Sequence, residues 1–342
     1  MHRPDGAPAE SVLLDWNESP IGPPQRAIDR VVSAAATLHR YPRGLMDEVA
    51  GLAAGYLGVS PTQILLTAGV DEAVDIALSL GRRAWGVVPG FDGYRERAEA
   101  NGKPFCPVPL GPDWQPGPGW DALGDGDIVF LAQPGNPTGT LVSDAFLDRI
   151  RGAATYLFLD ETYQDFSSCP SALAEAGPAP GLLVYRSFSK AMGLAGIRLG
   201  CLVADAATIA RLEPLRRFMP IDAVSLNAAA GLLEDPGFVK QLTDHVAAAR
   251  VELAAILRDC GLFAEVRSTE ANFALARLPA DGGARLLDGL AQAQIRVRTC
   301  DPFGLPGWIR VSVGSWDDQR RLQECLRRLA ELIARKERHA HP

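Results

Sequence analysis

Several patterns that would place a chain in a familiar class are absent from these 342 residues. No Cys-x-x-Cys pair occurs, and no histidine stands close to any of the six cysteines, so neither a zinc site nor a paired-cysteine redox motif is expected. No run of about 18 apolar residues is present, and the start, MHRPDGAPAES, has no apolar signal core. We therefore expect a cytoplasmic protein with reduced thiols.

Clustered positive charge is also lacking. The 34 Lys and Arg are outnumbered by 41 Asp and Glu, which gives a net charge of -7, and only the short tail LIARKERHAH is visibly basic. Such a charge pattern argues against nucleic acid and anionic membranes as partners. We expect small-molecule substrates instead.

What the sequence does contain is a large apolar fraction, 47%, beside 22% charged residues, which is typical of a globular protein with a sizeable core. Between about residues 64 and 205, continuous apolar runs such as ILLT, AWGVV, DIVFLA, YLFLD and GLLVYRSF alternate with amphipathic stretches. Continuous apolar strands are buried on both faces, which favours a mostly parallel sheet covered by helices. The fold class predicted is α/β.

Three segments are predicted along the chain. Residues 1–25 contain SPIGPP and are expected to form an extended arm rather than a packed element. Residues 26–232 form the large domain. From residue 233 the pattern becomes a long helix, the strands FAEVRS and NFALARL, a helix, the strand pair IRVRT and WIRVSVG, and a closing helix. This pattern predicts a smaller α+β domain over residues 233–342.

Polar residues follow four of the predicted strands. AGVDE follows ILLT, QPGNPTG follows DIVFLA, Asp160 ends YLFLD, and Ser187, Ser189 and Lys190 come at the end of GLLVYRSF. Ligands of open parallel sheets bind beyond the carboxyl ends of the strands, and a glycine turn into a helix offers free N–H groups to an anion. One rim of the sheet would therefore carry an anion cradle, an amide, a carboxylate and an amine. This combination predicts a site for a phosphorylated, nitrogen-containing cofactor.

Lys190 lies in RSFSKAMGLAGIRLG, among small and mostly apolar residues. A lysine with few anions around it and with Arg198 nearby has a lowered pKa, which is what a nucleophilic amine needs to form a Schiff base. Pyridoxal phosphate also requires a partner for its ring nitrogen and a phosphate cradle. Asp160 can supply the first, and Ser187, Ser189, Arg198 and the AGVDE turn can supply the second.

In combination these motifs resemble the fold-type-I pyridoxal-phosphate enzymes of the class I and II aminotransferase family, near histidinol-phosphate aminotransferase and threonine-phosphate decarboxylase. The resemblance runs in chain order through LDWNESPIGPP, RYPRGLMDEVAGL, VVPGFDGY, NPTG, LDETY, SFSKAMGLAGIRLG, ANFALARL and WIRVSVG. It implies a large domain whose mostly parallel sheet is sandwiched by helices, a smaller α+β C-terminal domain, and a biosynthetic homodimer with shared active sites.

The resemblance also implies roles in holding pyridoxal 5'-phosphate. Lys190 would form the Schiff base and, once freed, move the Cα proton, while Asp160 would keep the ring nitrogen protonated. Asn136 and the catalytic Tyr163 would hydrogen-bond the phenolic oxygen, and Phe91 would stack on the ring. The phosphate would meet Ser187, Ser189, Arg198, the backbone of Gly69, Val70 and Asp71, and Tyr41 from the neighbouring subunit.

On the substrate side, Arg310 matches the family's arginine that grips a carboxylate with a bidentate fork, and Arg298 matches a second one. The arm departs from the family pattern N-E-N-P-Y, because NESPI places Ser19 and Ile21 at the positions of the second asparagine and the tyrosine. This departure weakens histidinol phosphate as the substrate, and we count Ile21 as a substrate-side residue.

The reaction depends on which bond at the substrate Cα stands perpendicular to the cofactor ring. An upright C–H bond gives transamination, and an upright bond to the carboxylate gives decarboxylation. Three segments look closer to threonine-phosphate decarboxylase: PGFDGY, LRRFMPIDAVSLNAAAG and VRTCDPFGLP. Glu18 and VSVGSWDD look closer to the aminotransferases. We predict an aminotransferase that uses a 2-oxo acid as amino partner. The alternatives are decarboxylation of an amino acid or phosphoamino acid, another reaction at Cα, and a non-catalytic protein that keeps the fold.

Overall fold

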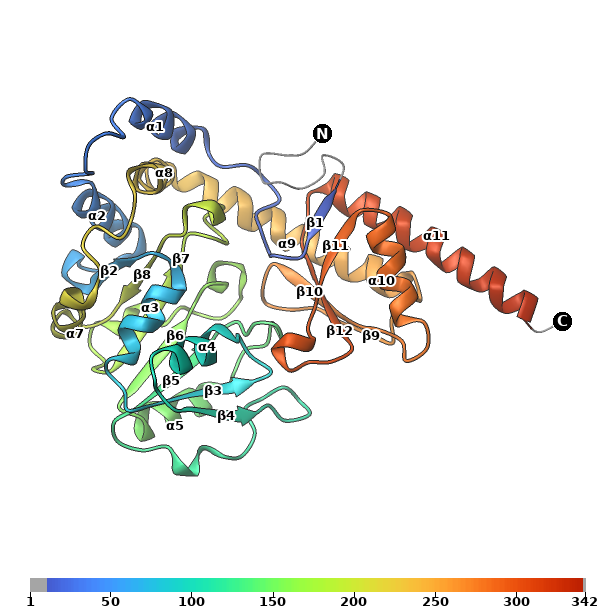
Figure 1. Cartoon of the computed structure of the whole chain (residues 1–342), viewed down its shortest axis with the longest axis horizontal. Coiled ribbons are helices and arrows are strands. Elements are labelled where there is room, and N and C mark those ends of the chain that lie inside the picture. Colours follow the sequence, from blue (N-terminus) through green and yellow to red (C-terminus); the bar gives the residue numbers. More distant parts are fainter. Residues whose placement is uncertain (1–10, 341–342) are drawn as a thin grey trace.

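Two β-sheets organise residues 11–340, which are the residues that this computed structural model describes. Figure 1 shows them side by side, with the smaller sheet next to the C-terminal helix. The larger sheet has seven strands in the order β2-β8-β7-β6-β5-β3-β4. Their bounds are Ile64–Thr67 (β2), Arg83–Val88 (β3), Phe105–Pro109 (β4), Asp127–Ala132 (β5), Tyr156–Asp160 (β6), Leu182–Ser187 (β7) and Gly200–Val203 (β8).

The larger sheet is mostly parallel, as the continuous apolar runs predict. β5 pairs in parallel with β3 and β6, β3 with β4, and β6 with β7, whereas β8 runs antiparallel to its neighbours β2 and β7. Within β5, Ile128 and Phe130 belong to the core cluster on one face, and Val129 and Leu131 belong to the cluster on the other. Both faces are therefore buried, and the α/β prediction is confirmed.

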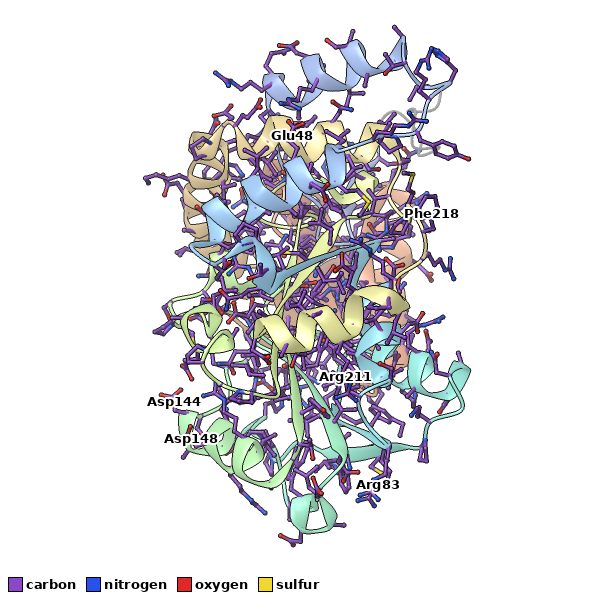
Figure 2. The ribbon with its side chains drawn as sticks, turned by 90° about the vertical axis from the view of Figure 1, so that its left-hand side faces the viewer. Glu48, Arg83, Asp144, Asp148, Arg211 and Phe218 are labelled. Carbon is purple, nitrogen blue, oxygen red and sulfur yellow. The ribbon has the colours of Figure 1, made fainter. Side chains whose placement is uncertain are left out.

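Helices cover both faces of this sheet. α3, α4 and α7 share the core that contains Ile128, and α2, α5 and α8 share the core that contains Val129. α1 packs on α8 and forms one end of the molecule in both views (Figures 1 and 2). The bounds are Gln25–Ala35 (α1), Leu45–Leu57 (α2), Gly69–Leu78 (α3), Gly93–Ala100 (α4), Asp144–Ala153 (α5), Leu173–Ala176 (α6), Ala206–Leu212 (α7) and Ala223–Leu233 (α8).

The smaller sheet has five strands in the order β1-β11-β12-β10-β9. α9 packs on β9 and β10, and α10 packs on β11 and α11. The two strand pairs and the closing helix predicted for this region are all present. The bounds are Val12–Leu14 (β1), Glu265–Arg267 (β9), Phe273–Arg277 (β10), Ile295–Thr299 (β11), Trp308–Ser312 (β12), Pro236–Asp259 (α9), Gly283–Gln292 (α10) and Trp316–Ala340 (α11).

The arm differs from the prediction. Val12 and Leu14 are fully buried, and β1 pairs in parallel with β11 of the smaller sheet, so the expectation of an unpacked arm was wrong for these residues. Because β1 is the edge strand of the smaller sheet, the arm connects the smaller sheet to the part of the fold that contains the larger sheet. The limits 1–25, 26–232 and 233–342 stay a prediction, with residues 1–10 outside the described part.

The structure also bears on the patterns that the sequence lacks. The six cysteines are unpaired. Among residues 11–340, no helix combines the length and the apolar character that crossing a membrane requires. In the same residues, no group of three or more His, Cys, Asp or Glu side chains is arranged to hold a metal ion.

Candidate active site

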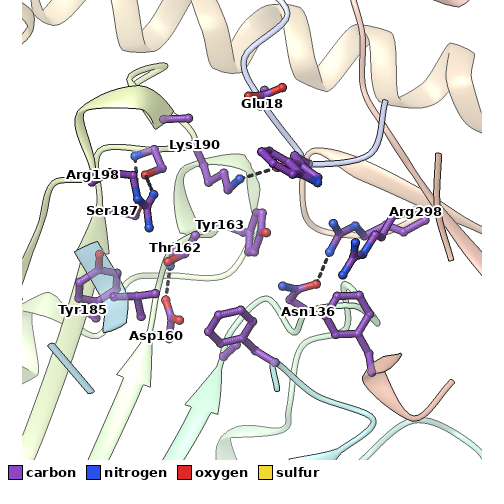
Figure 3. A pocket seen from close by; sticks show the side chains of 18 of the residues that line it. Glu18, Asn136, Asp160, Thr162, Tyr163, Tyr185, Ser187, Lys190, Arg198 and Arg298 are labelled. Atoms are coloured by element: carbon purple, nitrogen blue, oxygen red, sulfur yellow. Dashed lines mark hydrogen bonds between the residues drawn. The ribbon is translucent and has the colours of Figure 1, made fainter. Parts of the chain in front are cut away.

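A pocket of about 620 Å³ lies at the carboxyl ends of β5, β6 and β7, between the larger sheet and the smaller one. Ala132, Asp160 and Ser187, which end these three strands, all line it, and Arg298 and Arg310 face it from β11 and β12. Figure 3 shows the labelled side chains converging on this space. A pocket of several hundred Å³ suits a small organic ligand.

Asp160 is the buried carboxylate of the pocket. Its side chain is 5% exposed. Oδ1 accepts a hydrogen bond from the Thr162 backbone N–H at 2.9 Å, and Oδ2 accepts one from the Tyr94 hydroxyl at 2.6 Å. Burial raises the pKa of Asp160, while the bonds from Thr162 and Tyr94 act in the opposite direction. A buried carboxylate held by neutral donors alone favours a cationic ligand group.

Lys190 provides an amine that is partly neutral at neutral pH. Its Nζ donates a hydrogen bond to the Trp16 carbonyl oxygen at 2.7 Å. Burial, followed by the nearby charges of Arg310 and Arg198, lowers the pKa of Lys190 to about 7, while Glu18 acts in the opposite direction. The side chain reaches the pocket, so about half of the amines are available there as nucleophiles at pH 7, compared with about one in a few thousand for an ordinary lysine.

An anion cradle lies beside the lysine. Ser187 Oγ accepts a hydrogen bond from the Ser189 N–H at 3.1 Å, and Arg198 Nη1 donates to Ser189 Oγ at 3.4 Å. α3 begins next to them, and the first N–H groups of a helix have no intrahelical acceptor. Gly69 adopts a φ of 79°, and a Cβ there would lie 3.1 Å from Arg198 Nη2. Glycine thus lets the helix start approach the arginine closely.

Arg310 is a buried cation whose partners are uncharged. It is 6% exposed. Nη1 donates to Asn136 Oδ1 at 2.6 Å and Nη2 donates to the Asp15 carbonyl oxygen at 2.9 Å, while the guanidinium lies over the rings of Phe273 and Phe303. Its Nε has no hydrogen-bond partner within residues 11–340. A buried guanidinium without a carboxylate partner is suited to bind an anionic ligand group.

Asn17 connects the arm to this site. It is fully buried, its Nδ2 donates to Tyr163 Oη at 3.0 Å, and Ser312 Oγ donates to its Oδ1 at 2.8 Å. Its φ of 54° lies in the left-handed region, which asparagine adopts more readily than most residues. Because Asn17 donates to the Tyr163 oxygen, the hydroxyl's own proton is free to be donated to another acceptor.

Most of the residues singled out from the sequence line this pocket, and four do not. Ile21 is half-buried against the main core, and Tyr41 is 71% exposed. Gly69 and Asp71 flank Val70 at the start of α3 without lining the pocket. The lining candidates are Val70, Phe91, Asn136, Asp160, Tyr163, Ser187, Ser189, Lys190, Arg198, Arg298 and Arg310.

Other functional positions could not be found from the sequence. Nothing in NESP distinguishes Asn17 from an asparagine that merely makes a turn. Tyr94 stands out in PGFDGY only as an aromatic residue, and its partner Asp160 is 66 positions away. Trp16 and Phe303 also line the pocket, and only the fold brings them to it.

Comparisons with known proteins agree on one family. The model of aminotransferase class I and II matches residues 9–329. Histidinol-phosphate aminotransferase of Symbiobacterium thermophilum is 31% identical over 92% of this chain and 90% of its own. A crystal structure from Burkholderia pseudomallei has a TM-score of 0.86 and 33% identity over 95% of this chain and all of that one.

Two further crystal structures share the fold at lower identity. Histidinol-phosphate aminotransferase of Sinorhizobium meliloti, in complex with pyridoxal-5'-phosphate, has a TM-score of 0.82 and 22% identity, covering 94% of this chain and 91% of that one. L-threonine-O-3-phosphate decarboxylase of Porphyromonas gingivalis has a TM-score of 0.82 and 21% identity, covering 94% and 99%.

Proposed function

Because the chain belongs to the class I and II aminotransferase family, and is a pyridoxal-phosphate-dependent aminotransferase, we propose how its own residues hold the cofactor and move an amino group between an amino acid or related amine and a 2-oxo acid. The observation that carries the proposal is one pocket that combines a partly neutral amine, a buried carboxylate and an anion cradle. Its substrates are small molecules.

The donor set fits the cofactor. When bound, pyridoxal phosphate supplies an aldehyde that condenses with amines and a ring that withdraws electrons from the substrate Cα. Lys190 is the amine that would attach to the aldehyde, and Asp160 would hold the proton on the ring nitrogen. Ser187, Ser189 and Arg198, with the start of α3, would bind the phosphate, since this cradle offers hydroxyl, guanidinium and backbone N–H donors to an anion.

Other side chains of the pocket would orient the ring. Phe91 can cover one face of it, and Asn136 and Tyr163 can hydrogen-bond its phenolic oxygen. The bond from Asn17 to Tyr163 supports this role, because it leaves the Tyr163 proton free to be donated. Tyr163 is 5% exposed, so that proton has few water molecules as competing acceptors.

Arg310 would bind the substrate carboxylate, and Lys190 would move the proton. Within residues 11–340, the Arg310 guanidinium has only neutral acceptors, so a carboxylate brings the opposite charge that it lacks. Arg298 lies over Phe303 in the same pocket and is the second candidate for an anionic substrate group. A lysine with a pKa of about 7 is suited both to accept a proton and to return it near neutral pH.

The proposal is tested by mixing the purified holoenzyme with single amino donors and no 2-oxo acid. We expect the cofactor to change to its pyridoxamine form, seen as loss of the visible absorbance, with one 2-oxo acid formed for each cofactor converted. The stoichiometry follows because no acceptor is present to regenerate the enzyme. Release of carbon dioxide without this conversion would contradict transamination and identify a decarboxylase.

The Arg310→Ala variant is the companion measurement. Loss of a charge-assisted bond predicts that the donor concentration for half-conversion rises about 10- to 100-fold, with cofactor affinity unchanged. For amines that have no carboxylate, the donor concentration for half-conversion should be the same in this variant and in the wild type. Arg285→Ala, on the exposed face of α10, serves as the matched control. An Arg310→Ala enzyme with wild-type donor dependence would show that Arg310 is structural.

We also propose a homodimer in which Tyr41 reaches the cofactor phosphate of the partner subunit. Large apolar side chains are unusually exposed near α1 and before α8: Val32 at 67%, Leu38 at 54%, Tyr41 at 71%, Leu215 at 52% and Phe218 at 87%. Figure 2 shows Phe218 at the edge of the molecule. Exposed apolar groups of this size support a protein interface.

Phe218→Asp is expected to weaken the dimer. Sedimentation equilibrium should give twice the chain mass for the wild type and a lower mass for the variant, together with weaker cofactor binding. Val251→Asp replaces another exposed apolar residue, 71% exposed on α9, and should change neither property. A monomeric wild-type holoenzyme would remove both the dimer and the role of Tyr41.

The cytoplasm is our proposal for the location. The six unpaired cysteines support it, because disulfides are uncommon in proteins of reducing compartments.

A further inference from the structure

The hydroxyl of Tyr94 makes a short hydrogen bond to the carboxylate of the pocket. Tyr94 lies in the first turn of α4, and its Oη is 2.6 Å from Asp160 Oδ2. The two side chains are 4% and 5% exposed, so water competes little for either group. Burial, and then the nearby Asp160 charge, raise the pKa of Tyr94 well above its ordinary value. The proton therefore stays on the phenol, and Tyr94 is the donor.

Packing fixes the direction of this hydroxyl. The Tyr94 ring is stacked on Phe130 at 5.4 Å and meets the edges of Phe91 at 5.2 Å and Phe158 at 6.4 Å. Gly93 permits the arrangement, because a Cβ there would lie 2.4 Å from the Phe91 ring. Three aromatic rings thus hold the phenol in place, and the same cluster positions Phe91, which lines the pocket.

The carboxylate depends on this donor. Thr162 N–H bonds Oδ1 and Tyr94 bonds Oδ2, which leaves lone pairs on both oxygens for a ligand. Burial favours the protonated acid, and these bonds favour the ionised one. Removing a hydrogen bond to a charged group predicts an increase of about 10- to 100-fold in the ratio of protonated to ionised Asp160.

We propose that Tyr94 is a positioning residue for the cofactor: its hydroxyl keeps the Asp160 carboxylate ionised and turned toward the pocket, where it can hold the ring nitrogen. The inference rests on the role proposed above for Asp160. Tyr94 does not line the main pocket itself, and it acts through the carboxylate.

The test compares Tyr94→Phe holoenzyme with the wild type. Phenylalanine keeps the ring packing and removes only the hydroxyl. We expect cofactor affinity to fall about tenfold or more, and the acid-side loss of affinity to begin at higher pH because Asp160 accepts its proton earlier. With ¹⁵N-labelled cofactor, the NMR shift of the ring nitrogen should move toward that of neutral pyridine. Activity is not needed for any of these readouts.

Tyr156→Phe is the matched control. Tyr156 begins the strand that Asp160 ends, and its hydroxyl accepts an exposed bond from Arg211 Nη1 at 3.0 Å. This variant should match the wild type in affinity, pH profile and NMR shift. A Tyr94→Phe enzyme that also matches the wild type, or that loses affinity equally at every pH with an unchanged shift, would overturn the inference and leave Tyr94 a packing residue.

A double-mutant cycle separates this inference from the proposal on which it rests. In an Asp160→Asn background, Tyr94→Phe should have little further effect, because the ionisable group is gone. If Asp160→Asn alone binds the cofactor like the wild type, the role of Asp160 is wrong. If Asp160→Asn loses cofactor affinity but Tyr94→Phe does not, only the role of Tyr94 is wrong. If the Tyr94→Phe variant does not fold, a Tyr94→Phe/Asp160→Asn double variant that does fold supports the coupling of the two residues. If neither variant folds, the inference is overturned.

Discussion

Replacing Lys190 by alanine is expected to abolish covalent attachment of the cofactor and to lower turnover by about 10⁴-fold, since the amine is also the proposed proton carrier. After borohydride treatment, mass spectrometry of the wild-type holoenzyme should show one added cofactor, located at Lys190. Lys240→Ala is the control, because Lys240 is an exposed lysine on α9 that pairs with Asp244. An Lys190→Ala protein that still traps the cofactor would mean that another lysine carries it.

The pH dependence of attachment follows from the surroundings of Lys190. Only the neutral amine attacks an aldehyde, and the pKa of Lys190 is lowered to about 7. The rate of cofactor attachment to the cofactor-free protein should therefore rise about tenfold per pH unit below pH 7 and level off above it. A rate that kept rising to about pH 10 would show an ordinary, solvated lysine. Stopped-flow absorbance measures this rate directly.

The sequence allowed the scaffold of the site to be predicted because the scaffold is local. Continuous apolar runs predict β5, β6 and β7, and in a parallel sheet their carboxyl ends must lie at one rim. The rim positions of Asp160 and Lys190 follow from the strands that precede them. The resemblance to the aminotransferases added Arg310 and Arg298, whose strands belong to the other sheet.

What the sequence did not reveal depends on contacts between distant residues. Arg310 meets Asn136 across 174 positions, and Asn17 meets Tyr163 across 146. β1 has only three residues and precedes a segment rich in proline, so its pairing with β11 left no periodic signal. β4, with the sequence FCPVP, went unpredicted because prolines oppose a strand, yet they are tolerated at the sheet edge where it lies.

The conservative replacement Asp160→Asn should be the other variant with a very large effect. Asparagine has nearly the same size but cannot ionise, so no charge holds the proton on the ring nitrogen. The asparagine amide also has only one oxygen to accept hydrogen bonds, whereas the Thr162 N–H and the Tyr94 hydroxyl donate to two different oxygens of Asp160. If its oxygen accepts from the Thr162 N–H, its NH₂ faces the Tyr94 hydroxyl, which must then turn its proton away.

We expect Asp160→Asn to bind the cofactor more weakly and to slow removal of the substrate Cα proton by about 10³-fold, a loss comparable with that of a pre-organised charge-stabilising group. Exchange of the Cα hydrogen in D₂O, followed by NMR, measures this step apart from substrate binding. Asp160→Glu keeps the charge on a longer side chain, so it should recover part of the rate if charge is the cause. Should glutamate be no better than asparagine, the fit of the buried carboxylate between Thr162 and Tyr94 matters more than its charge. Exchange at the wild-type rate in Asp160→Asn would place the ring-nitrogen partner elsewhere in the pocket.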